Sequence, residues 1–372
     1  MSMHGENAYP VLHLSRCGPI YGLARQLLYF TNHIDRQRFP LIVAVDEPGP
    51  LKDELIRTNV GCVFRPMSPW RSFPYLVSRH LDARRLVKLA RENGCRIVHA
   101  QDVWKAEYAY FIAERLGIPS VVHIRGPLDR RDIVKHRLIR ADAIIAIGRR
   151  YVDDLIAAGI PAERITLIDD AVDFDLFSAE KYPRPARADG IVRIGMVGRI
   201  SREKRVRELL EAVALLPQEI VQRLDMTIIG ATDLDYQREI ESDLDRLRLR
   251  GLVRFPGGIP AAQMPGQLAN LDLLVTLAGG SVIYEAMAMG TPVLTVSRDS
   301  RPRQHTRHDQ TAWCLGTDQP QEVAKALALL ADDEPLRRRL GAAGQDWVRR
   351  HLGIPAMVRA TQETYERLLK HA

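Results

Sequence analysis

The chain has 372 residues, of which 46% are hydrophobic and 27% charged, with a mean hydropathy of −0.17. This composition indicates a globular protein of two or three domains and excludes disordered and fibrous architectures. No apolar stretch reaches the ~18 residues that a membrane-spanning helix needs, and residues 1–10 lack the pattern of a signal peptide. We therefore expect a cytoplasmic protein.

The positive charge is concentrated in one region. The formal net charge is +7, and residues 65–140 contain 16 Lys/Arg against 7 Asp/Glu. Such a region faces an anionic partner or forms a solvated surface.

The four cysteines, Cys17, Cys62, Cys95 and Cys314, stand far apart and form no CxxC pair. We expect free thiols rather than a disulfide framework or a zinc site.

Apolar runs of strand length alternate with helical periods through the first half of the chain. We expect strands at 11–14, 41–45, 97–100, 120–124, 143–147 and 165–168, and helices at 23–33, 81–93, 107–116 and 150–158. Gly-Ile-Pro, a strong stop signal, ends two of these helices. Continuous β-branched strands alternating with helices predict a parallel sheet covered on both faces.

The alternation stops at the polar, proline-containing segment 178–190 and then restarts. Strands are expected at 192–197, 226–229, 253–255, 273–277 and 292–296, and helices at 205–216, 236–249, 281–289, 321–330, 335–351 and 355–370. We therefore predict an α/β protein with two doubly wound, Rossmann-like domains facing a central cleft. The first domain is expected at 1–178, a linker at 179–190, the second domain at 191–354, and at 355–372 a helix that packs back on the first domain.

The first candidate functional cluster is Gly198-Arg199-Ile200-Ser201-Arg202-Glu203-Lys204, between a strand and a helix. Arg199 and Lys204 suit a diphosphate, because free backbone N–H groups and the helix dipole add to their charge. The alternative is a solvated charged loop.

The second cluster opens with Gly279-Gly280-Ser281 and carries Glu285 in the first turns of an apolar helix. Bare N–H groups are again offered to an anion. A partly buried carboxylate needs partners, which sugar or ribose hydroxyls supply, although a capping carboxylate is the alternative.

Together the two clusters resemble the family 4 glycosyltransferases, which have the two-Rossmann GT-B architecture. The family's GR…EK segment matches Gly198-Arg199 and Glu203-Lys204, and its EAMA-G-PV segment matches 285–288, Gly290 and 292–293. Weaker similarities at 141–146 and 172–177 extend the resemblance over nearly the whole chain.

The resemblance implies a retaining, metal-independent enzyme of bacterial cell-surface polysaccharide or lipopolysaccharide synthesis. Its donor would be a UDP- or GDP-linked sugar, used without a cofactor. Arg199 and Lys204 would stabilise the leaving diphosphate and Glu285 would hold the ribose. The further donor-binding residues that it implies are Gly18, Gly22, Gly198, Gly230, Ile259, Ser281 and Val282.

The chain departs from the family pattern at several positions. Leu277 stands where a second glutamate is usual, segment 272–285 is short, and Asp170-Ala171 replaces Asn-Gly. The Gly-Gly-Ser loop also resembles that of an inverting GT-B enzyme, the one that adds N-acetylglucosamine to lipid-linked muropeptide. Arg125 stands where the family often has histidine, and His123 is a second candidate catalytic residue, with a structural histidine as the alternative.

The acceptor is expected to be a glycan or a lipid-linked molecule. Trp70, Phe73 and Tyr75 lie among the cations of residues 65–140, which favours contact with an anionic membrane surface, at the inner face of the plasma membrane. A solvated helix face is the alternative, and no nucleic-acid motif accompanies the charge. A nucleotide-sugar 2-epimerase and a catalytically silent sugar-nucleotide-binding module remain alternative functions.

Overall fold

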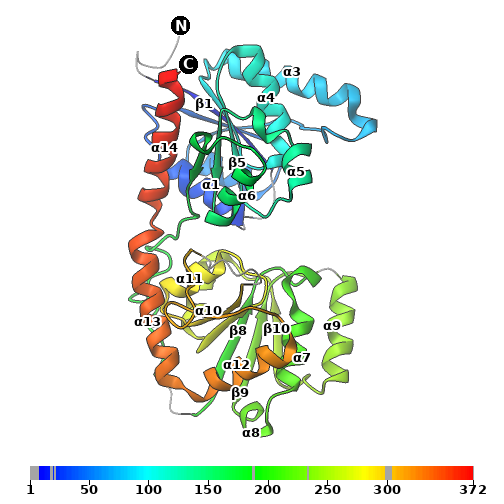
Figure 1. Ribbon diagram of the computed structural model, residues 1–372, viewed down its shortest axis with the longest axis vertical. Helices are drawn as coiled ribbons and strands as arrows, with labels where there is room; N and C mark the ends of the chain where they lie inside the picture. Colours follow the sequence, from blue (N-terminus) through cyan, green and yellow to red (C-terminus); the bar gives the residue numbers. More distant parts are fainter. Residues whose placement is uncertain are drawn as a thin grey trace. The chain divides into compact units, whose positions relative to one another are not determined.

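The computed structural model describes residues 8–16, 20, 22–186, 189–232, 234–297 and 304–371. They form two compact units, one of residues 1–171 with 354–372 and the other of residues 172–353. Each unit holds one parallel sheet flanked by helices (Figure 1). The prediction of two Rossmann-like domains is therefore confirmed.

The sheet of the first unit reverses its strand order near its centre. Its strands are β1 (Val11–Ser15), β2 (Leu41–Val45), β3 (Gly61–Phe64), β4 (Ile97–Ala100), β5 (Ser120–Ile124), β6 (Ala143–Ala146) and β7 (Ile165–Leu167). They lie in the order β3-β2-β1-β4-β5-β6-β7. The carboxyl ends of β1 and β4 thus form a switch point, where open α/β sheets bind ligands.

The helices of the first unit cover both faces of this sheet. They are α1 (Gly22–His33), α2 (Pro50–Arg57), α3 (Leu76–Glu92), α4 (Ala106–Leu116), α5 (Arg130–Lys135), α6 (Arg149–Ala157) and α14 (Ile354–His371). One face packs residues of α1, α2 and α14 around Phe39 and Tyr365, and the other packs α3 and α4 around Leu86 and Tyr108. Helix α14 therefore belongs to the first unit, as expected.

The second unit repeats the design. Its strands are β8 (Val192–Val197), β9 (Leu224–Ile229), β10 (Val253–Gly257), β11 (Leu273–Thr276), β12 (Val293–Val296) and β13 (Trp313–Leu315). Their order, β10-β9-β8-β11-β12-β13, puts the switch point between β8 and β11. The helices are α7 (Val206–Ala214), α8 (Gln218–Val221), α9 (Leu234–Arg246), α10 (Met264–Ala269), α11 (Val282–Ala288), α12 (Pro320–Asp332) and α13 (Glu334–His351).

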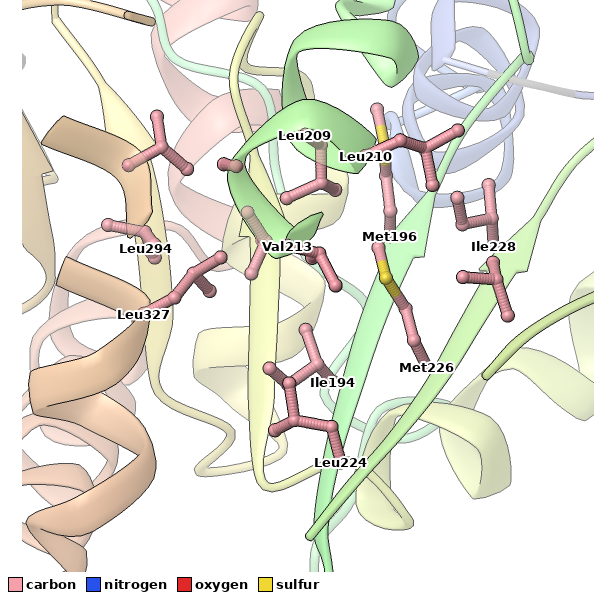
Figure 2. Packing of buried hydrophobic residues seen from close by; sticks show 14 of the residues in the cluster. Ile194, Met196, Leu209, Leu210, Val213, Leu224, Met226, Ile228, Leu294 and Leu327 are labelled. Carbon is pink, nitrogen blue, oxygen red and sulfur yellow. The ribbon is translucent and has the colours of Figure 1, made fainter. Parts of the chain in front are cut away.

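The core of the second unit fixes the direction of β8. Side chains of α7, among them Leu209 and Val213, pack over Ile194 and Met196 of β8, with Leu327 of α12 beside them (Figure 2). Buried side chains pack along the whole length of β8. The loop that follows the strand therefore begins at a fixed position.

The boundary between the units differs from the predicted linker at 179–190. The division falls after Ala171, and the described part of the segment packs on the second unit. Phe177, just before the segment, is fully buried; within the segment Tyr182 packs against the same core and Arg184 pairs with Asp272 at 3.3 Å. The prolines predicted the irregular backbone of this segment correctly. The contacts, however, attach the described part of the segment to the second unit.

We predict that Tyr365→Ala destabilises the first unit by ~3–5 kcal/mol, as other aromatic truncations in cores do. Tyr365 is fully buried between Phe30 and Phe39, at ring distances of 6.2 and 5.6 Å. Urea unfolding followed by tryptophan fluorescence measures the change. Arg359→Ala, at an exposed position of the same helix, is the control and should leave the free energy of unfolding unchanged.

Candidate functional site

The carboxyl edge of the second sheet is built from backbone in close contact. A Cβ atom on residue 230 would lie 1.8 Å from the carbonyl oxygen of Gly198, so only glycine fits there. The Gly198 amide donates to the Ile229 carbonyl (2.9 Å), and the Gly230 amide donates to the Gly257 carbonyl (2.9 Å). Gly198 itself has a φ of 142°, which favours glycine. The loops after β8, β9 and β10 thus form one connected edge.

Lys204 joins this edge to the loop after β11. Its Nζ donates to the Gly279 carbonyl at 3.3 Å, and the Thr276 hydroxyl donates to the same oxygen at 3.2 Å. Gly279 and Gly280 have φ of 73° and 132°, and the Gly280 Cα lies so close that an added Cβ would be 3.6 Å from Nζ. The structure therefore brings together the two clusters of the sequence analysis, at the switch point.

Arg199 and Ser201 line the same loop. The Arg199 side chain is 72% exposed and lies 3.5 Å from Glu203, an exposed pair of the kind that contributes little to stability. Ser201 has a buried hydroxyl with no hydrogen-bond partner among the described residues. An exposed cation and a hydroxyl without a protein partner can both turn toward an anion.

The remaining donor-side candidates lie around this edge. Glu285 is buried in α11, with Val282 buried and Ser281 half-buried just before it. Ile259 is half-buried in the loop after β10. Leu277, which replaces the family's first glutamate, is buried in the apolar core with Ile194 and Leu209. The glutamate is therefore replaced by a core residue, which leaves no carboxylate at this position.

The glycine candidates of the first unit are only partly described. Gly18 lies outside the described residues, while Gly22 begins α1 with a φ of 27°. An added Cβ on Gly22 would meet no described atom within 4 Å.

Three buried histidines lie on one face of the first sheet at its switch point. His13 of β1 pairs in register with His99 of β4, and His123 of β5 stacks on His99 at a ring distance of 5.6 Å. Gln101 lies 2.6 Å from Nδ1 of His13, and the Tyr365 hydroxyl lies 2.7 Å from Nδ1 of His99 and 3.3 Å from Nε2 of His13.

One arrangement of protons satisfies this chain of bonds. The Gln101 amide donates to His13, the His13 Nε2–H donates to the Tyr365 oxygen, and the Tyr365 hydroxyl donates to His99. Each histidine in it is neutral. Burial, reinforced by the charge of Arg125, lowers the pKa of His13 to about 3. Burial also lowers the pKa of His99 and His123 well below the usual range.

Arg125 extends the histidine cluster to the carboxyl edge. Its Nη1 donates to Asp170 at 2.6 Å and its Nη2 donates to Nδ1 of His123 at 3.3 Å. Both partners of the ion pair are largely buried. Asp170 stands where the family usually has Asn, and Arg125 stands where it often has His. The two residues that differ from the family pattern therefore contact each other as an ion pair.

Two further ion pairs line this edge. Lys105 Nζ lies 2.5 Å from Asp46, and Arg16 lies 3.7 Å from Asp102. Burial raises the pKa of Asp102, against the opposing charges of Arg16 and Lys105. Sequence analysis did not identify these carboxylates, nor His13, His99 or Tyr365, because their partners lie far apart in the sequence and meet only in the folded unit.

Comparison with protein-family models now assigns the chain. Residues 180–347 match the model "Glycosyl transferases group 1" and residues 20–176 match "Glycosyltransferase Family 4". The chain is a family 4 glycosyltransferase. Its GT-B architecture is shared with solved glycosyltransferase structures.

Individual relatives of this glycosyltransferase differ in their acceptors. A 2-deoxystreptamine glucosyltransferase of Streptomyces kanamyceticus is 27% identical over 76% of this chain and 80% of its own. The lipopolysaccharide core biosynthesis glycosyltransferase LpsD of Rhizobium meliloti is 29% identical over 48% of this chain and 50% of its own. Anabaena HepE in complex with UDP-glucose superposes with a TM-score of 0.81 at 18% identity, covering 96% and 99% of the two chains.

Other features bear on the expectations from composition. Cys95 is a buried free thiol, and Cys17 lies outside the described residues. Across the described ranges, no three His, Cys, Asp or Glu side chains gather in a way that could hold a metal ion. No described helix of this glycosyltransferase is both long and apolar enough to cross a membrane.

We predict that Gly230→Ala weakens donor binding by moving the turn at Gly198, since the added Cβ meets backbone at 1.8 Å. Isothermal calorimetry with nucleoside diphosphates should show the loss. Gly251→Ala, where a Cβ would meet no described atom within 4 Å, is the control and should bind normally. Unchanged affinity in Gly230→Ala would contradict the role of this contact.

We predict that the first unit loses stability as the pH falls below about 6.5, the unfolded pKa of histidine. The folded pKa of His13 is about 3, so the unfolded state binds more protons between these values. One such histidine costs ~1.4 kcal/mol per pH unit. Urea unfolding of His13→Gln between pH 7 and pH 5 should show a shallower dependence by about this slope. His351→Gln, at an exposed position, should keep the wild-type slope.

Proposed function

We propose that this glycosyltransferase moves a sugar from a UDP- or GDP-linked donor to a glycan or lipid-linked acceptor in bacterial cell-surface polysaccharide synthesis. The observation that carries the proposal is the edge formed by Gly198, Gly230, Lys204 and Gly279. Closely packed backbone that keeps side chains out of the edge, together with a lysine at a switch point, suits a nucleotide diphosphate. The UDP-glucose complex of Anabaena HepE, which has the same fold, supports a nucleotide-sugar donor.

In this proposal, Lys204 neutralises the diphosphate as the glycosidic bond breaks. Its ammonium group donates to the Gly279 carbonyl, which orients it at this edge. Arg199 is free to turn from Glu203 onto the phosphates, because that pair is exposed. Glu285 accepts hydrogen bonds from the ribose hydroxyls. These cations would supply the positive charge that the leaving group needs, so the reaction is proposed to proceed without a metal.

The acceptor is proposed to be rich in hydroxyl groups. At the carboxyl edge of the first unit, Arg16, Lys105 and Arg125 each have a carboxylate partner, so the edge is close to neutral. Paired carboxylates and guanidinium groups bind sugar hydroxyls well. The lipopolysaccharide role of LpsD supports a glycan of the cell surface. The enzyme would then work at the inner face of the plasma membrane.

A panel of nucleotide sugars tests the function directly. The correct donor should raise the melting temperature, because it binds only the native state. Slow release of nucleoside diphosphate and free sugar, identified by NMR as one anomer, should follow. Retention is expected from the family. Release of an epimer would favour a 2-epimerase, and binding without any turnover would favour a silent module.

Variants of two side chains test the proposed donor site. We expect Lys204→Ala to lower kcat/KM about 100- to 1,000-fold, as loss of a transition-state donor does elsewhere. Glu285→Gln should weaken binding of the bare nucleoside diphosphate while the chain stays folded. The matched control is Arg202→Ala in the same loop, because Arg202 pairs with Glu239 instead of facing Gly279. Wild-type donor affinity and turnover in Lys204→Ala would contradict the assignment.

A further inference from the structure

The beginning of α3 exposes large apolar side chains. The 3-10 turn η1 (Phe73–Tyr75) and the first six residues of α3 contain no buried residue. Five apolar or aromatic side chains of this segment are exposed instead. The side chain of Phe73 is 82% exposed and that of Val77 is 73% exposed, and Tyr75, Leu76 and Leu81 are each at least 40% exposed. From Asp82 onward the same helix has a buried face. In Figure 1 the start of α3 points away from the first sheet.

The exposed stripe of α3 changes from apolar to cationic along the helix. Val77, Leu81, Arg84, Lys88 and Arg91 follow one another at spacings of four and three residues, so they lie on one face. All five are exposed. With a rise of 1.5 Å per residue the stripe is about 21 Å long. An interfacial helix needs this combination of apolar and basic groups on one surface.

The cations of the stripe are available to a partner. Lys88 lies 3.7 Å from Glu92, but both side chains are mostly exposed, and such pairs are weak. For Arg84 and Arg91 the described part of the chain offers no ion pair within 4.0 Å.

Buried contacts hold the segment before η1 in place. Glu107 of α4 is buried and lies 2.5 Å from Arg71, and 3.8 and 3.9 Å from Arg137 and Arg140. Arg140 also pairs with Glu114, so three arginines face two carboxylates here. Trp70, which the sequence analysis placed at a membrane, instead packs on Tyr108 at a ring distance of 4.9 Å and anchors the segment from within.

We propose that η1 and the exposed stripe of α3 form a docking surface for an anionic lipid bilayer. Phe73, Val77 and Leu81 enter the interfacial region, and Arg84, Lys88 and Arg91 contact lipid phosphates. The proposal rests on the proposed function for its partner, since a lipid-linked acceptor brings the enzyme to a bilayer. A second copy of the chain fits less well, because a symmetric contact would oppose identical cations.

Vesicle co-sedimentation of the full chain tests this surface. The probes are vesicles of phosphatidylcholine alone and vesicles that also contain phosphatidylglycerol. We expect binding only to the anionic vesicles, weakened by salt as screening shortens the reach of the charges. Each cation removed should lower affinity about fivefold, so Arg84→Gln/Lys88→Gln/Arg91→Gln should bind about 100-fold more weakly. Phe73→Ser/Val77→Ser should lose about tenfold through its apolar contact.

Matched changes on the second unit are the controls. Leu234→Ser has the same exposure as Val77, and Lys325→Gln removes an exposed lysine that pairs with a neighbouring glutamate, as Lys88 does. Both should bind anionic vesicles normally. Equal binding to both kinds of vesicle, binding to neither, or self-association that Val77→Ser abolishes would each overturn the docking surface.

Donor binding separates this proposal from the proposed function. The melting-temperature shift with the nucleotide-sugar panel is measured on the same protein preparations without vesicles. A normal donor shift with no vesicle binding overturns the docking surface alone. Vesicle binding with no donor shift contradicts the proposed function and leaves the docking surface supported.

Discussion

The contact between residue 230 and the carbonyl of Gly198 decides the geometry of the candidate donor site. The turn after β8 lies directly against the end of β9, and this close approach is possible because residue 230 is glycine and has no side chain. Arg199 and Ser201 therefore start from fixed backbone, and the short 3-10 turn η5 (Arg202–Lys204) carries Lys204 to the Gly279 carbonyl. A looser turn would spread these groups apart. Preorganised donors cost no reorganisation when charge develops on a leaving group, which is why the glycines matter as much as the cations.

The two units use the same sheet topology for different chemistry at their switch points. The second unit presents glycines, backbone amides and a lysine that can face an anion. The first unit buries three neutral histidines under α14 and pairs its charges, with Arg125 against Asp170. Neutral, well-packed polar groups give a rigid edge with little net charge. This division is what a transferase needs if one unit binds a diphosphate and the other binds hydroxyl groups.

Much of the fold could be predicted from the sequence, because apolar periodicity reports burial. The strands 41–45, 97–100, 120–124 and 192–197 were predicted with the observed bounds, and the Gly198–Lys204 and Gly279–Glu285 clusters meet at one edge. Helix α3 was predicted to begin at residue 81 and begins at Leu76, since its first turns face no core and leave no periodic pattern. The His13–His99–Tyr365 cluster was missed because it joins residues far apart in the sequence. The segment 179–190 was predicted as a linker from its prolines, which report backbone irregularity but not tertiary contacts.

The central claim is that a nucleotide diphosphate binds at the carboxyl edge of the second sheet. Hydrogen–deuterium exchange of the full chain, with and without the nucleoside diphosphate that binds most tightly, tests it most directly. The account predicts added protection in peptides that span 198–206 and 276–286, with little change at the opposite edge near 184–192. Protection confined to the first unit or to that opposite edge would contradict the account.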